Sequence, residues 1–248
     1  RISGYLRDLL IAICLGAGPI ADAFFVAFRI PNTFRRLFSE GTFNAAFVPS
    51  YTTELNKGKK KAEIFANNIF NILLISLLTI VLIIEIFMPL FVSIIAPGFK
   101  EDVDKMELAI ILTRITFPFL FFVSLSSFFS AILNSHNKFA AASATPIILN
   151  IILILVLFFG KFLADKLVYY ISYAVTFAGI IQLIFLIFLT YHSLSRLSAI
   201  NIVFTSKYST DDSTSKSKPV AKNNTYVEIL ISYFWGLLPL IFLSYFIP

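Results

Sequence analysis

The sequence has little of what soluble enzymes use for their chemistry. A single cysteine, Cys14, excludes an intrachain disulfide, and two well-separated histidines, His136 and His192, offer no cluster of metal ligands. Only 14% of the 248 residues are charged, whereas 58% are hydrophobic and the mean hydropathy is +0.87. This composition lies outside that of soluble domains and predicts an all-α, polytopic membrane helical bundle.

Long apolar runs are present instead, and about twenty residues of helix are needed to cross a hydrocarbon layer of ~30 Å. The runs predict seven transmembrane helices, of which the first is short and the second unusually long. Their expected bounds are about 1–16, 20–52, 66–95, 107–133, 140–160, 167–191 and 226–247.

The loops between these runs differ in charge. One loop holds four lysines, Lys57 and Lys59 to Lys61, whereas the next one, PGFKEDVDKME, balances its two lysines with acids. Because cytoplasmic loops carry an excess of Lys and Arg, the first of these loops is expected inside and the second outside. Strict alternation of the remaining spans then predicts a cytoplasmic amino terminus.

A polar segment marks the one clear boundary in the chain. YSTDDSTSKSKPVAKNN is rich in Ser, Lys, Asp and Asn and has no apolar period, which is typical of a disordered linker. We therefore predict three parts: an amino-terminal six-helix lobe over 1–191, a cytoplasmic linker over 192–225, and one further helix over 226–248.

Several arginines remain within or at the ends of the expected spans, where each costs about 2.5–3.5 kcal/mol at a helix centre unless it pairs or faces water. Asp22, Arg29, Arg36 and Glu40 fall on one face of the second helix. Arg1 and Asp8 share a face of the first helix, with Arg7 beside Asp8 in sequence. A short turn, GAGP, joins the two helices, so we expect them to be antiparallel neighbours whose polar faces meet.

Two interpretations of these charges are open. Single arginines can extend to the headgroups at either interface. A shared polar cavity suits the whole constellation better, since planar guanidinium groups bind phosphate oxygens in pairs. Pro31 lies within the second helix and predicts a kink or local unwinding there. The residues thus favour a watery cavity that accepts an anion.

The segments RISGYLRDLLIAICLGAG and ADAFFVAFRIPNTFRRLFSEGTFNAAFVPSY closely resemble the amino-terminal signature of the MurJ (MviN) lipid II flippases of the MOP exporter superfamily. The resemblance implies a transporter rather than an enzyme. Its cargo would be the undecaprenyl-diphosphate-linked peptidoglycan precursor, moved from the inner to the outer leaflet of the bacterial inner membrane. It also implies two lobes of helices around a cationic cavity that opens alternately to each side.

The resemblance assigns roles to residues of this sequence. Substrate binding is expected of Arg1, Arg7, Asp8, Arg29, Arg35 and Arg36, and gating of Asp22 and Glu40. In that picture Asp8 positions Arg7. The partners implied are lipid II, membrane lipids and a second-lobe polypeptide or another copy of the chain. Neither a cofactor nor a nucleic-acid partner is expected, although a coupling ion or the membrane potential could drive the cycle.

Alternatives remain at this point. Family members carry about fourteen helices, so this chain could be a truncated, inactive or partner-dependent half-transporter. Another oligosaccharide-lipid exporter of the superfamily would not share the RRLFSEG stripe. A membrane enzyme acting on lipid diphosphates would need a nucleophile, a base or a pair of metal-binding carboxylates, and the sequence has no such motif.

Overall fold

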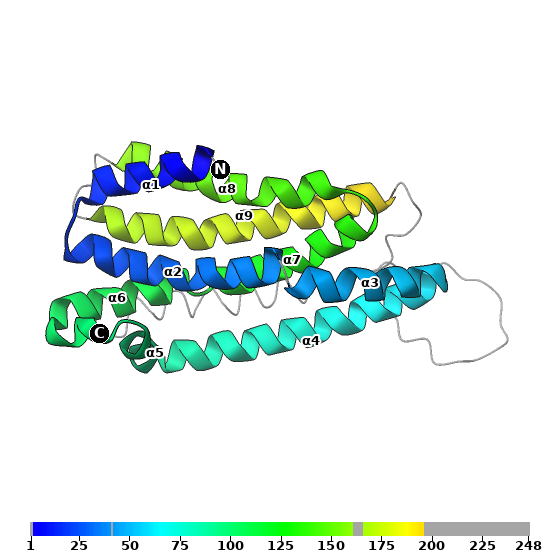
Figure 1. Ribbon diagram of the computed structural model, residues 1–248, viewed down its shortest axis with the longest axis horizontal. Helices are drawn as coiled ribbons and strands as arrows, with labels where there is room; N and C mark the ends of the chain where they lie inside the picture. The colour runs from blue at the N-terminus through cyan, green and yellow to red at the C-terminus, as the bar shows by residue number, and fades with distance from the viewer. Residues whose placement is uncertain (1, 41, 161–165, 196–248) are drawn as a thin grey trace, which may run out of the picture.

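The computed structural model describes residues 2–40, 42–160 and 166–195, and within these ranges all regular structure is helical. The described elements are α1 (Ile2–Leu15), α2 (Pro19–Glu40), α3 (Thr42–Asn56), α4 (Lys59–Ile86), α5 (Met88–Ile95), the 3-10 helix η1 (Pro97–Glu101), α6 (Val103–Thr116), α7 (Phe119–Ser135), α8 (Phe139–Gly160) and α9 (Leu167–Ser195). The predicted all-α bundle is confirmed (Figure 1).

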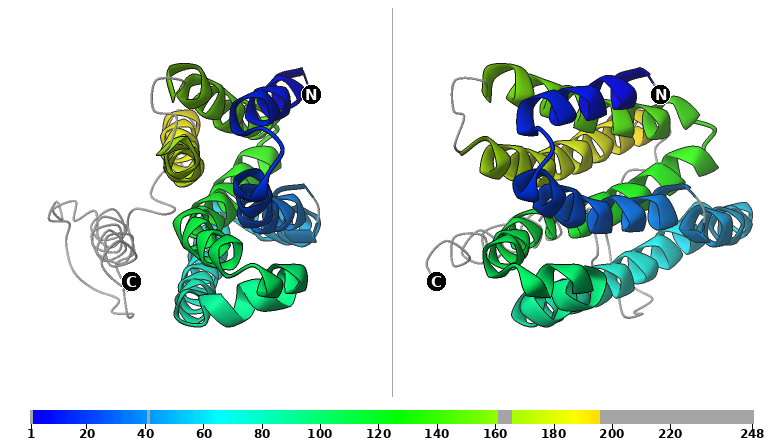
Figure 2. Two further views of the ribbon diagram at one scale, coloured as in Figure 1. Left: turned by 90° about the vertical axis from the view of Figure 1, so that its left-hand side faces the viewer. Right: turned by 60° about the vertical axis from the view of Figure 1, so that its left-hand side comes forward.

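Helix α7 is the centre of the bundle. Every residue from Phe119 to Leu133 is buried, and α2, α3, α4, α8 and α9 all pack against it. The turned views in Figure 2 show these helices arranged around α7. A helix that is apolar on all sides is stable only inside a bundle or a membrane, so α7 forms the core that fixes the other helices.

Helix α4 has two different faces. Its buried residues recur every three or four positions, namely Ala62, Ala66, Phe70, Leu74, Leu77 and Val81. Large apolar side chains such as Ile72, Ile75 and Ile83 are exposed on the rest of its surface. An exposed face made of isoleucines is stable against lipid tails, whereas water would penalise it.

Four helical stretches are long and apolar enough to cross a membrane: Lys59–Ile86, Val103–Ser135, Phe139–Gly160 and Leu167–Ser193. They correspond to the third to sixth expected spans, although the third ends at Ile86 rather than near 95. Pro89, in the first turn of α5, lacks the amide that would continue α4, so the chain turns at Phe87.

The first two expected spans are covered by α1, α2 and α3. Helix α1 has 14 residues, fewer than a full crossing needs. The second expected span, over 20–52, is covered by α2 and α3, which lie on either side of residue 41. They lie end to end along the bundle in Figure 1, so together they follow the course expected of one span.

Pro31 does not unwind α2, although unwinding was one of the two outcomes expected at this position. The helix continues through it from Pro19 to Glu40. Proline has no amide hydrogen for the carbonyl of Ala27, four residues earlier. The hydroxyl of Thr116 in α6 donates to that carbonyl at 3.0 Å. A neighbouring helix thus satisfies the backbone group that Pro31 leaves free.

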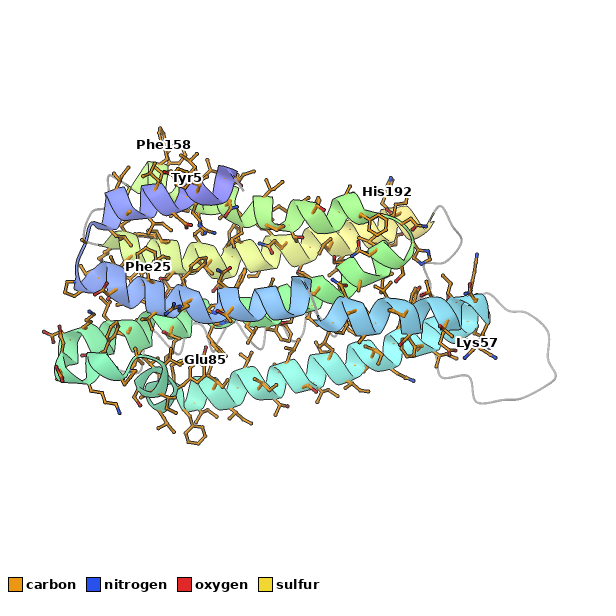
Figure 3. All side chains as sticks on the ribbon, in the orientation of Figure 1. Tyr5, Phe25, Lys57, Glu85, Phe158 and His192 are labelled. Carbon is orange, nitrogen blue, oxygen red and sulfur yellow. The ribbon has the colours of Figure 1, made fainter. Side chains whose placement is uncertain are left out.

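The connections between helices separate to the two ends of the bundle. The α3–α4 turn with Lys57, the α7–α8 turn and the end of α9 near His192 lie at one end (Figures 1 and 3). The α1–α2 turn and η1 lie at the other. The lysine-rich turn and the acidic connection after α5 therefore occupy opposite ends. Residues 196–248, which include most of the expected linker and the seventh span, lie outside the described residues.

Candidate anion-binding site

The turn between α1 and α2 sets the position of the candidate site. Gly16 adopts a left-handed backbone with φ of 68°, and its amide bonds to the carbonyl of Ala12. This geometry ends α1 where a glycine is favoured. Helices α1 and α2 are consequently antiparallel, as expected, but α1 packs mainly along α8 and touches α2 less (Figure 1).

Arg7 is held by groups from three helices. Its Nε and Nη2 atoms donate to Oδ1 of Asp8 at 2.9 and 2.6 Å. Its Nη1 atom donates to Oδ1 of Asn150 in α8 at 2.9 Å. The guanidinium carbon lies 5.3 Å from the centre of the Phe28 ring in α2, within the range of a cation–π contact. The Arg7 side chain is 13% exposed, so a partly buried positive charge lies where α1, α2 and α8 meet.

Asn150 is buried in the middle of α8 and uses both ends of its amide. Its Oδ1 atom accepts from Arg7, and its Nδ2 atom donates to the hydroxyl of Ser3 at 3.0 Å. An unpaired amide at this depth would be costly. The two hydrogen bonds satisfy it and at the same time attach α1 to α8.

The polar face of α2 is exposed along its described part. Asp22, Arg29 and Thr33 are exposed, whereas Phe24 and Ala27 on the opposite face are buried. The expected separation of a polar from an apolar face is therefore present. The carboxylate of Asp22 accepts a hydrogen bond from a residue on another helix.

Lys105 of α6 provides that contact. Its Nζ atom lies 2.6 Å from Oδ2 of Asp22 and 4.3 Å from the centre of the Phe99 ring. Lys105 is 18% exposed and Asp22 is 56% exposed. The ion pair joins the start of α2 to the first turn of α6.

The structure describes only part of the predicted site. Arg1 lies outside the described residues. Arg35, Arg36 and Glu40 belong to the last turns of α2, but their side chains are likewise outside the description. Arg7, Asp8, Asp22 and Arg29 are described, and Arg7 contacts Asp8 as expected. The roles of all eight residues stay predictions.

Two residues of the site were missed by the sequence argument. Asn150 stands in a long apolar run, and Lys105 in a loop whose charges served only to orient the chain. The available signal for Asn150 was its isolation, since a lone amide in an apolar membrane helix needs a partner. Nothing in the local pattern indicates which partner it has.

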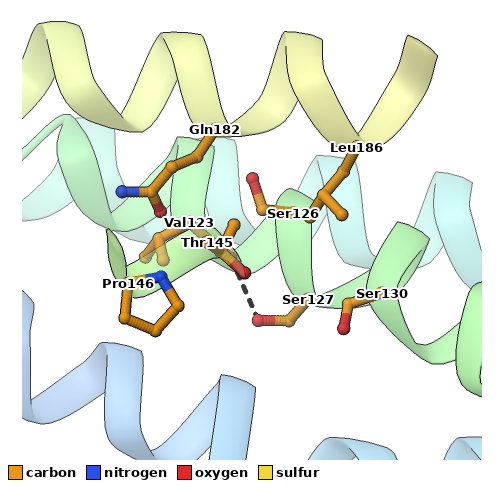
Figure 4. A pocket seen from close by; sticks show the side chains of 8 residues that line it. All are labelled: Val123, Ser126, Ser127, Ser130, Thr145, Pro146, Gln182 and Leu186. Carbon is orange, nitrogen blue, oxygen red and sulfur yellow. Dashed lines mark hydrogen bonds between the residues drawn. The ribbon is translucent and has the colours of Figure 1, made fainter. Parts of the chain in front are cut away.

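A second polar place lies deeper in the bundle, between α7, α8 and α9 (Figure 4). This small cavity is lined by Ser126, Ser127, Ser130, Thr145 and Gln182. The centre of a water molecule can move within about 10 Å³ of it. The hydroxyls of Ser126 and Ser127 donate to carbonyls of their own helix. This volume suits about one water and is far too small for a lipid headgroup. Among the described residues no group of three His, Cys, Asp or Glu could hold a metal.

Comparison with known proteins decides the family. A family model described as "Lipid II flippase MurJ" matches residues 11–219. The chain belongs to the MurJ family. Flippases are transporters rather than enzymes. The four helical stretches that are long and apolar enough to cross a membrane agree with this family, so the chain is a multi-pass membrane protein.

Curated MurJ relatives agree over most of this chain. A probable lipid II flippase MurJ from Rhizobium tropici is 45% identical over 188 residues, which are 74% of this chain and 35% of the relative. The corresponding protein of Rickettsia prowazekii is 40% identical over 187 residues, 75% of this chain and 36% of the relative. The chain thus spans little more than a third of the length of these MurJ proteins.

A solved structure shares the fold. It is described as lipid II flippase MurJ in an inward closed conformation, with a TM-score of 0.63 and 24% identity. The match covers 99% of this chain and 44% of that structure. This likeness shows that the described helices share the fold of the solved flippase.

Proposed function

We propose that this chain forms the amino-terminal lobe of a lipid II flippase. The flippase moves the undecaprenyl-diphosphate-linked peptidoglycan precursor from the inner to the outer leaflet of the bacterial inner membrane by alternating access. Membership of the MurJ family supports the class of cargo, since lipid II is the substrate that the relatives' names carry. The amino terminus is proposed to be cytoplasmic.

The structural observation that carries the anion-binding part is the environment of Arg7. A guanidinium that is mostly withdrawn from water and fixed by three side chains keeps a defined direction. A diphosphate is a doubly charged group with oxygens spaced for paired donors, which suits an arginine better than a lysine. Arg1, Arg29, Arg35 and Arg36 are proposed to add positive charge along the same path.

Asp22 is proposed to act in gating at the end of the bundle opposite the lysine-rich turn. Its ion pair with Lys105 joins α2 to the η1–α6 connection at that end. Breaking and remaking an exposed ion pair costs little free energy, which suits a contact that opens in each cycle. Glu40 is proposed to act in gating as well.

A second candidate function is that of a partner-dependent half-transporter. The chain matches 35–36% of the length of these relatives. In a half-transporter, another polypeptide or a second copy supplies the other wall of the cavity.

The test is complementation in a bacterium depleted of its own flippase. Surface exposure of the lipid-linked precursor is measured with residues 1–248 alone and together with a polypeptide that covers the rest of a relative. Restored exposure in either case supports the flippase, and dependence on the second polypeptide identifies the half-transporter.

The matched variant is Arg36→Glu, which reverses one charge on the polar face of α2. It is expected to abolish export while membrane insertion stays normal. A chain that inserts correctly yet restores exposure in neither arrangement contradicts the proposal, and so does normal export by the Arg36→Glu variant.

A further inference from the structure

We infer that Asn150 is a positioning residue that directs the Arg7 guanidinium toward its anionic ligand. The inference rests on the proposed function, because it concerns how the same site holds a diphosphate. It adds a residue of α8 to a site whose expected members all lie on the first two helices.

Asn150 is the contact that relates Arg7 to the rest of the lobe. Asp8 is the neighbour of Arg7 on α1, and its side chain is 58% exposed, so it moves wherever α1 moves. Asn150 belongs to α8, is 8% exposed, and lies 143 positions from Arg7 in sequence. Among the described contacts, the hydrogen bond to Asn150 is the one that joins the guanidinium to another helix.

The described hydrogen bonds leave donors for a ligand. A guanidinium has five N–H groups. One on Nε, one on Nη2 and one on Nη1 are used by Asp8 and Asn150. One N–H then remains on each terminal nitrogen, which is the number needed to hold two oxygens of a phosphate. Because Asn150 already accepts a hydrogen bond from Nη1, rotation of the guanidinium plane is restricted.

The Asn150 amide also attaches α1, the helix that carries Arg7, to α8. Its Nδ2 atom donates to Ser3, one turn before Arg7 on α1. The Phe28 ring limits the guanidinium from the side of α2. Loss of the Asn150 amide would free the direction of the charge without removing it, so ligand binding should weaken while the net charge is unchanged.

The test uses the full chain purified in detergent, with farnesyl diphosphate as the probe and farnesol as the uncharged control. Asn150→Leu keeps the volume of the side chain and removes both hydrogen bonds. We expect it to weaken farnesyl diphosphate binding about tenfold, a change of ~1.4 kcal/mol. Gly4→Ala is the matched control, since a methyl there meets Asn150 Nδ2 at 3.8 Å and breaks no bond.

A double-mutant cycle separates positioning from packing. Asn150→Leu in an Arg7→Ala background should have no further effect on binding, because the group it positions is gone. An equal loss in both backgrounds, or a lower melting temperature with unchanged affinity, overturns the inference. Ser3→Ala breaks only the second amide bond and should cost less than threefold. If Asn150→Leu does not fold, Asn150→Ser shortens the side chain and is expected to give the same pattern.

Two further outcomes distinguish this inference from the proposed function. If Arg7→Ala abolishes binding and Asn150→Leu does not change it, the anion site stands and the role of Asn150 is wrong. If the unaltered chain does not distinguish farnesyl diphosphate from farnesol, the anion site itself is wrong and the inference falls with it. The ¹⁵N resonance of the Arg7 Nε–H group gives a ligand-free check, as it should shift and broaden in Asn150→Leu and stay unchanged in Gly4→Ala.

Discussion

Two charged side chains near the site, Arg7 and Lys105, are each held by a specific partner. Arg7 is paired with Asp8 and bonded to Asn150, and Lys105 is paired with Asp22. A guanidinium facing lipid without such contacts would cost several times RT. At the residue scale, the site is therefore a set of paired charges whose pairs differ in exposure.

The Asp22–Lys105 pair allows a charge-swap experiment. Lys105→Asp places two carboxylates together and is expected to impair transport, whereas Asp22→Lys with Lys105→Asp restores the pair and the activity. Because Asp22 is largely exposed, each single change should alter the free energy of unfolding by no more than ~1 kcal/mol. Surface exposure of the precursor and thermal unfolding are measured together. Equal activity of the single and the swapped variants would show that the pair has no part in gating.

His136 predicts a dependence of stability on pH. Its Nε2 atom lies 3.4 Å from the hydroxyl of Tyr51, and burial, together with nearby Lys59, lowers the pKa of the imidazole below its usual 6.5. At a pH between the lowered pKa of the folded state and the usual 6.5 of the unfolded chain, the unfolded imidazole binds more protons than the folded one. The folded state therefore loses stability as the pH falls below 6.5. Above that pH the contribution is constant.

The measurement for His136 is thermal unfolding in detergent between pH 7.5 and 5. The unaltered chain should unfold at a lower temperature at the acidic end. His136→Gln, which cannot be protonated, should lose part of this dependence while resembling the parent at pH 7.5. An unchanged slope in that variant would assign the dependence to other groups.

At the scale of helices, proline and threonine explain how irregular backbone is accommodated. Pro31 frees the carbonyl of Ala27, which Thr116 of α6 satisfies, and the hydroxyl of Thr176 in α9 donates to the carbonyl of Ile115 at the end of α6. Each bond joins two helices through a backbone group that has lost its helical donor or lies at a helix end. Helices α2, α6 and α9 are thereby connected at membrane depth, where no water is available to do so.

The Thr116 contact makes a prediction about α2. Thr116→Val keeps the shape and removes the hydroxyl, which leaves the Ala27 carbonyl buried without its donor and should destabilise the fold by about 1–2 kcal/mol. Thr116→Ser is the control that keeps the donor. In a Pro31→Ala background the amide of residue 31 can bond to Ala27 itself, so Thr116→Val should cost less there. Thermal unfolding of the four variants measures the coupling, and strictly additive losses would contradict it.

The two ends of the whole bundle differ in charge, because one end carries the lysine-rich turn and the other carries the acidic connection after α5. The turn with Lys57 and the connection that contains Lys100 lie at opposite ends of the bundle (Figure 1). If the lysine-rich end is cytoplasmic, α2 runs from the outer end of the bundle toward its middle, and α3 lies between there and the cytoplasmic end. The direction of lipid movement proposed above depends on this orientation.

Cysteine labelling tests the orientation. In a Cys14→Ser background, Lys57→Cys and Lys100→Cys each replace one exposed lysine. A membrane-impermeant maleimide applied to intact spheroplasts is expected to label the Lys100→Cys variant at once and the Lys57→Cys variant only after permeabilisation. The opposite pattern would reverse the proposed orientation.

The sequence alone determined the helical class, the positions of four membrane-crossing stretches and the family, because apolar runs and the local signature from Arg1 to Tyr51 depend on neighbouring residues only. It also identified Arg7 with Asp8, which are adjacent. It did not predict the turn at Phe87, since an apolar run looks the same on both sides of a change in direction.

The tertiary structure decided which distant residues complete the site. Arg7 bonds to Asn150, 143 positions away, and Asp22 to Lys105, 83 positions away. A helical period relates residues a few positions apart and contains no information about which helix packs beside another. That choice was made by helix packing. Helix α8 lies against α1 and the buried α7, which brings Asn150 to Arg7, and α6 lies along α2, which brings Lys105 to Asp22.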